Sequence, residues 1–157
     1  MSNVRTDFRN AKGVVKKLND RKVQYKVAEV ITSYAKRLIA SGQSPLQGDG
    51  RYAKYLNEER YPGNRKPRRP VNLNLTGKML RYLKTWIGEG GILRYGFRAG
   101  DTPEDVMTRA KAHQDGTETI VARPMVPTHG RKFAVSIQKA IRDVYTSALR
   151  DILRMSK

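Results

Sequence analysis

Two long amphipathic segments, one toward each end of the chain, most strongly limit the folds that this sequence can adopt. Over residues 23–40 apolar side chains recur every three or four positions, which places them on one stripe of a helix. Gly42 follows where a left-handed residue would end that helix. The same spacing runs over residues 133–152, and a shorter helix is expected over 6–18. Long helices must therefore account for both ends of the molecule.

The segment between these helices has short elements of both kinds. Two β-prone runs, 84–87 and 92–97, flank a glycine-rich tetrad and predict a hairpin. Thr76 is expected to cap a short helix over 77–83, and Thr102 to cap another that runs to about His113. Residues 119–122 are a strand candidate. Together the pattern predicts an α+β fold, in which a small antiparallel sheet packs against a long N-terminal and a long C-terminal helix.

Residues 43–70 have no helical or strand periodicity and are interrupted by glycine and proline, so we expect a long irregular basic loop there. The length of the chain suits a single domain, 1–157. Its expected parts are a helical N-terminal part (1–42), the extended basic loop (43–70), a mixed part of short helix, hairpin, helix and strand (71–127) and the C-terminal helix (128–157).

The net charge of +18 limits the partners of the chain. Such an excess favours a nearby polyanion or acidic protein surface. Because 17 Lys and Arg residues lie in 1–75 and 15 in 76–157, a single basic arm on a neutral body is excluded. The densest cluster surrounds Pro67 and suits contacts with phosphates or with an acidic groove. The candidate contacts with DNA or a protein partner are Arg51, Lys54, Tyr55, Arg60, Arg65, Lys66, Arg68 and Arg69.

No constellation in the sequence points to catalysis, a cofactor or a metal. Cysteine is absent, and His113 and His129 are the only imidazoles, which is too few for a zinc site with shared spacing. The glycine-rich tetrad 88–91 lacks the strand–loop–helix context and the lysine of a phosphate loop. We therefore expect no enzyme activity, and we expect an unexported protein because no signal peptide or membrane-spanning run is evident.

Three stretches, taken in order, resemble a known family. They are SGQSP with GDGRY at 41–52, RPVNLNLTGKML at 69–80, and HQDG followed by ARPMVP at 113–127. This order is similar to that of the tail-completion, or virion-morphogenesis, proteins of tailed bacteriophages. Met125 departs from the family, which more often has an aromatic residue there. The matching structural positions are Gly77, Gly96, Phe97, His113, Gly116, Arg123 and Pro124.

The resemblance implies a virion protein of the head–tail junction that is assembled in the host cytoplasm. Family members form a ring, commonly six-fold, that contacts the portal or connector and the tail proteins, with DNA in the channel as a further possible contact. A basic nucleic-acid-binding module without sequence specificity is the alternative. That alternative explains the charge but does not explain the ordered motifs.

Overall fold

The computed structural model describes residues 12–52, 77–118, 120–128 and 130–155. It confirms the α+β prediction, with helices and one two-stranded antiparallel sheet. Residues 12–18 are helical. The other elements are α2 (Arg21–Ala40), α3 (Lys78–Tyr82), β1 (Leu83–Ile87), the 3-10 helix η2 (Glu89–Gly91), β2 (Leu93–Phe97), α4 (Glu104–Asp115) and α5 (Val135–Arg154).

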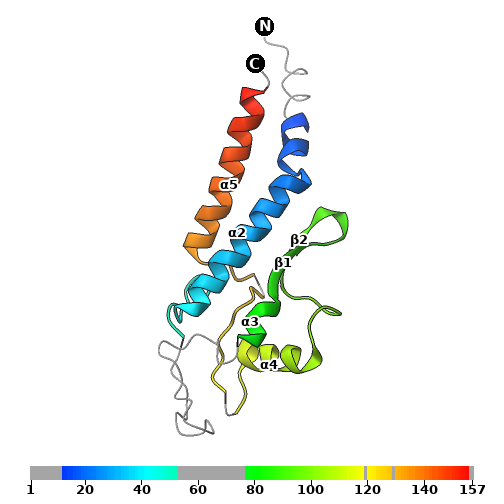
Figure 1. Cartoon of the computed structure of the whole chain (residues 1–157). Coiled ribbons are helices and arrows are strands. Elements are labelled where there is room, and N and C mark those ends of the chain that lie inside the picture. The colour runs from blue at the N-terminus through cyan, green and yellow to red at the C-terminus, as the bar shows by residue number, and fades with distance from the viewer. Residues whose placement is uncertain (1–11, 53–76, 119, 129, 156–157) are drawn as a thin grey trace.

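The two long helices lie side by side and run in opposite directions (Figure 1). Their contact buries Val27, Ile31 and Ala35 of α2 against Ile137 of α5. These residues belong to the apolar stripes that the sequence spacing identified. Burial of such aliphatic side chains stabilises the pair by roughly 1.5–3 kcal/mol for each large residue.

The hairpin packs on α2 on the side away from α5 (Figure 1). Its strands pair antiparallel, with Leu83 opposite Phe97 and Ile87 opposite Leu93. The Thr32 hydroxyl accepts a 2.9 Å hydrogen bond from the backbone N–H of Thr85, which fixes β1 against α2. A sheet of only two strands needs this cover to be stable. The predicted hairpin and its glycine-rich turn are confirmed.

A second core cluster lies at the opposite end of the molecule from residue 12 and Arg154. It joins the end of α2 to the two shorter helices, α3 and α4 (Figure 1). Met125, from the irregular segment after α4, is fully buried in it. Tyr95 and Tyr52 pack against its edge. The cluster's buried members are Ile39, Met79, Leu80, Leu83, Val106, Ala110 and Met125.

Several expected element boundaries were wrong. The last helix begins at Val135, because Phe133 pairs with Leu46 in an isolated β-bridge. Leu83 opens β1 and does not end α3. Pro103, not Thr102, is the N-cap of α4.

The sequence also made predictions for the caps of two helices and for one more strand. The N-cap of α3 is Gly77, with φ 68°, and the expected cap Thr76 lies outside the described residues. Residues 120–122 are irregular, so the strand expected over 119–122 is not formed by the part of it that is described. The expected end of α2 is confirmed: Ser41 caps it, and Gly42 follows with φ 77°.

Residues 43–52, the described start of the loop expected over 43–70, are irregular as predicted, but they are not extended. Residues 43–52 are folded back on themselves and packed, with Ser44, Pro45 and Leu46 buried. Residues 53–70 lie outside the described part of the chain, so the rest of the loop stays a prediction. The lack of periodicity at 43–52 reflects turns held by specific hydrogen bonds, which sequence periodicity does not report.

Candidate functional site

The packed segment 43–52 is the centre of the candidate site. Two backbone hydrogen bonds close it: Ser44 N–H donates to Gly50 O at 2.8 Å, and Tyr52 N–H donates to Gly42 O at 2.9 Å. Two more attach it to the start of the last helix. Ala134 N–H donates to Pro45 O at 2.7 Å, and Gln47 N–H donates to Lys132 O at 2.9 Å. The segment is thus fixed at both ends.

A second segment, 113–126, meets the first at Pro124. The Ser44 hydroxyl lies 3.1 Å from the carbonyl oxygen of Pro124 and 3.0 Å from a carboxylate oxygen of Asp49. The Tyr52 hydroxyl donates to the same Pro124 carbonyl at 3.4 Å. Asp49 also forms an ion pair with Arg131. Side-chain hydrogen bonds therefore join two parts of the chain that are distant in sequence, and Arg131 pairs with the first of them. We call the place where the two parts meet the two-loop junction (residues 43–52 and 113–126).

Gln114, in the last turn of α4, holds the second segment in place. Its side-chain oxygen accepts from the backbone N–H groups of Met125 and Val126 at 2.8 and 3.0 Å. Its side-chain amide donates to Val126 O at 2.9 Å. Both polar atoms of this half-buried side chain therefore form hydrogen bonds with the backbone, as buried amide groups require. Met125 is inserted in the core as a result.

The turn after α4 depends on Gly116. Its φ of 80° and ψ of 168° form a backbone conformation that is essentially restricted to glycine. A Cβ atom at this position would lie 3.0 Å from Ala122 N. The close approach brings the chain back so that Arg123 N–H donates to His113 O at 2.6 Å. A glycine is needed here for two independent reasons, conformation and space.

Electrostatic effects at the junction come from burial and from one buried cation. Arg123 is 1% exposed, and its guanidinium donates to Val121 O at 3.1 Å. Burial first, and the Arg123 charge second, lower the pKa of His113. Burial raises the pKa of Tyr52 and of Tyr95. At neutral pH the buried charge of Arg123 therefore lies near a neutral His113 imidazole and a neutral Tyr52 phenol.

The structure brings together most of the residues that the family motifs identified. His113, Gly116, Arg123 and Pro124 form the second segment of the junction. Gly96 is buried in β2 beside Val126, and Phe97 packs against the second core cluster. Gly77 stands apart from the junction at the start of α3.

The candidate contact residues are only partly described. Arg51 is exposed and pairs through its backbone with Gln43 in an isolated bridge. The other seven lie outside the described residues: Lys54, Tyr55, Arg60, Arg65, Lys66, Arg68 and Arg69.

Sequence reasoning did not single out Gln114, Asp49 or Arg131. Gln114 and Asp49 stand inside the motif stretches, and that position was the available signal for them. Arg131 gave no such signal, because its ion pair with Asp49 joins residues 82 positions apart. Long-range polar pairs of this kind follow from the fold alone.

Two features of the described residues bear on the kind of site. Within 12–52, 77–118, 120–128 and 130–155, no group of three or more His, Asp or Glu side chains is arranged to hold a metal ion. Over the same ranges, no helix combines the length and apolar character that crossing a membrane requires.

Comparisons with protein-family models, with curated proteins and with solved structures find no match to this chain.

Proposed function

We propose that this chain is a structural protein of the head–tail junction of a tailed bacteriophage, where copies of it assemble into a ring. The observation that supports this proposal is the meeting of two motif stretches at Pro124. Ser44 and Tyr52, from the first stretch, both reach this carbonyl across 80 and 72 positions of sequence. Motifs that resemble one family in order and spacing thus form one structural unit in this molecule.

The described residues on either side of 53–76 pack in one core cluster. Tyr52 packs against the cluster that contains Met79 and Leu80. In sequence, 53–76 contains seven of the eight candidate contacts, from Lys54 to Arg69. Tyrosine and arginine are the residues that most often supply binding energy at protein interfaces. We propose that these residues contact the portal or connector, the tail proteins, or DNA in the channel.

Neutralising the charges around Pro67 tests the proposal. In the variant, Arg65, Lys66, Arg68 and Arg69 are replaced together by glutamine. We expect ring assembly, measured by electron microscopy of the purified chain, to be lost, while the free energy of unfolding changes by less than about 0.5 kcal/mol.

A control variant with the same net charge tests whether the position of the neutralised residues matters. It replaces the exposed residues Arg81, Arg94, Lys132 and Arg142 by glutamine. This control should assemble like the wild type. If both variants assemble equally well, the segment around Pro67 is not an assembly contact, and that part of the proposal fails.

A nucleic-acid-binding module is the second candidate, favoured by the net charge of +18. Its affinity for duplex DNA would fall with log salt concentration at a slope of about −0.9 per neutralised phosphate. A steep slope from a chain that stays monomeric favours this candidate. Weak DNA binding together with ring formation favours the junction protein.

A further inference from the structure

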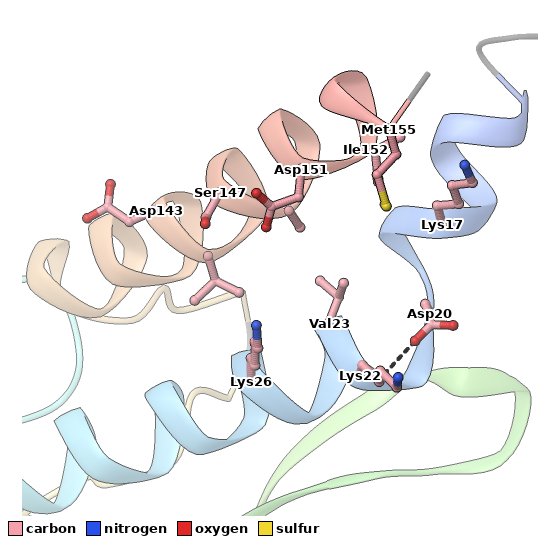
Figure 2. Close-up of a pocket in the computed structure, with 12 residues that line it drawn as sticks. Lys17, Asp20, Lys22, Val23, Lys26, Asp143, Ser147, Asp151, Ile152 and Met155 are labelled. Carbon is pink, nitrogen blue, oxygen red and sulfur yellow. Dashed lines mark hydrogen bonds between the residues drawn. The ribbon is translucent and has the colours of Figure 1, made fainter. Parts of the chain in front are cut away.

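The start of α2 and the end of α5 enclose a groove that nothing in the described chain fills. Its volume is about 670 Å³. Figure 2 shows Val23 and Lys26 of α2 directed toward α5, and Ile152 of α5 and its C-cap Met155 directed back toward α2. The chain turns at Asp20, the N-cap of α2, which separates α2 from the helix over 12–18.

The floor of the groove is aliphatic. Val23, Val144 and Ala148 are half-buried, and Ile152 is 6% exposed, whereas Met155 at the open end is 74% exposed. These residues continue the stripes that are buried farther along the same helix pair. A groove of this shape between two helices fits the apolar face of a third helix.

The charge around the groove is positive on the side of α2. Residues 12–26 contain six Lys and Arg residues and one acid, whereas residues 143–155 contain two basic residues and two acids. All eight basic side chains are exposed, and none forms an ion pair with another residue in the described part of the chain. Of the three acids that line the groove, Asp20 accepts a hydrogen bond from the backbone N–H of Lys22, and Asp143 forms an ion pair with Lys139.

We propose that this groove binds an amphipathic helix of a partner protein whose apolar stripe is flanked by Asp or Glu. The aliphatic floor contacts the apolar stripe of the partner helix. The rim residues Lys17, Lys22 and Lys26 form ion pairs with its acidic flanks. A second copy of this chain fits less well, because it brings the same positive end against itself. Nucleic acid fits less well because no aromatic side chain lines the groove to stack on a base. The inference does not depend on the head–tail role.

The test uses the full chain and two labelled synthetic helical peptides. Both carry leucine at alternating three- and four-residue spacing, one with glutamate flanks and one with lysine flanks. Fluorescence anisotropy should show binding of the glutamate peptide and at least tenfold weaker binding of the lysine peptide. Equal binding of the two peptides, or no binding of either, overturns the proposal.

Variants locate the binding. Ala148→Glu places a charge on the floor and should weaken binding of the glutamate peptide at least tenfold, with folding checked by circular dichroism. Reversing three exposed rim charges, by Lys17→Glu, Lys22→Glu and Lys26→Glu, should also weaken binding of the glutamate peptide at least tenfold. These substitutions do not alter the hydrophobic core. An unchanged affinity in the rim variant overturns the proposal, whether or not Ala148→Glu folds.

A matched control has the same net charge as the rim variant. It combines Arg81→Glu, Arg94→Glu and Lys132→Glu, all exposed and outside the groove. We expect its affinity for the glutamate peptide to stay within twofold of the wild type. A loss equal to that of the rim variant would mean general charge attraction and would overturn the proposal.

Three other occupants give distinct results, each of which overturns the proposal. A second copy would give self-association in sedimentation equilibrium that Ala148→Glu abolishes. Duplex DNA as occupant would displace the glutamate peptide and would itself bind more weakly to Ala148→Glu. Occupation by the chain's own residues 1–11 would make their deletion strengthen peptide binding about tenfold.

Discussion

The hydroxyl oxygen of Ser44 lies 3.1 Å from the carbonyl oxygen of Pro124, 80 positions later in the chain. The same hydroxyl accepts from the backbone N–H of Leu46 at 3.2 Å and lies within hydrogen-bonding distance of Asp49. One 4% exposed side chain therefore connects the segment that precedes the basic region to the segment that follows α4. Four predictions test the role of this junction, and a fifth tests the assembly itself.

Replacing Ser44 by alanine should lower the free energy of unfolding by about 1–3 kcal/mol. The substitution leaves the buried backbone N–H of Leu46 without its hydroxyl partner, and such a donor costs about that much, while the Pro124 carbonyl keeps the Tyr52 hydroxyl. Urea unfolding measures the change. Ser33→Ala is the control, since the Ser33 hydroxyl bonds Val30 O on an exposed helix face, and it should change stability by less than about 0.5 kcal/mol. Equal effects in the two variants would remove the special role of Ser44.

Gly116→Ala should destabilise the chain more than Gly100→Ala. Both glycines have positive φ, 80° and 84°, so both substitutions carry backbone strain of about 1 kcal/mol or more. Only at Gly116 would the new Cβ lie 3.0 Å from Ala122 N, while Gly100 has open space around it. Thermal unfolding of the two variants compares them directly. A Gly100→Ala variant that is the less stable of the two would contradict the close approach at Gly116.

Gln114→Leu should cost about 2–4 kcal/mol of stability, because two backbone N–H groups and one carbonyl lose their partner together. Gln114→Glu keeps the oxygen that accepts from Met125 and Val126, and it replaces the donor to Val126 O by an acceptor oxygen. Its loss, measured by urea unfolding at pH 7, should be the smaller of the two. The opposite order would show that packing of the side chain, not its hydrogen bonds, holds the segment.

His113 predicts a pH dependence of stability. Its pKa is lowered in the folded chain from an ordinary value of 6.5, so the unfolded chain binds more protons in the interval just below pH 6.5. Stability should therefore be full above about pH 6.5 and fall as the pH decreases through that interval. His113→Gln should flatten the curve there. The carboxylates of Asp101 and Asp105, whose pKa values are also lowered from 3.8, contribute only at more acidic pH. An unchanged curve in His113→Gln would assign the effect to another group.

The sequence predicted the long helices and the hairpin because these elements depend on local spacing. The apolar stripe that includes Val27 and Ile31 has helical periodicity, and the two runs around 88–91 have strand propensity with a turn between them. The strand expected over 119–122 failed because β-prone residues there serve a turn, in which Thr117 N–H donates to Ile120 O at 2.8 Å. Short apolar runs do not carry enough local information to separate these outcomes.

The candidate site was less accessible to sequence reasoning. The motif stretches pointed to Pro124 and Gly116, but nothing local indicates that Ser44 reaches Pro124 or that Gln114 holds Met125. The groove was also unexpected, because the periodic positions Val23 and Ala148 predict helix packing, whereas the helices separate at that end of the pair. Contacts between distant parts of a chain, and places where they fail to meet, depend on the whole fold.

The most direct test of the central claim is electron microscopy of the purified full-length chain over a range of concentrations. The head–tail junction proposal predicts closed rings of uniform diameter, with a common rotational symmetry in class averages. A chain that remains monomeric at every concentration, and binds duplex DNA with a steep salt dependence, would contradict it.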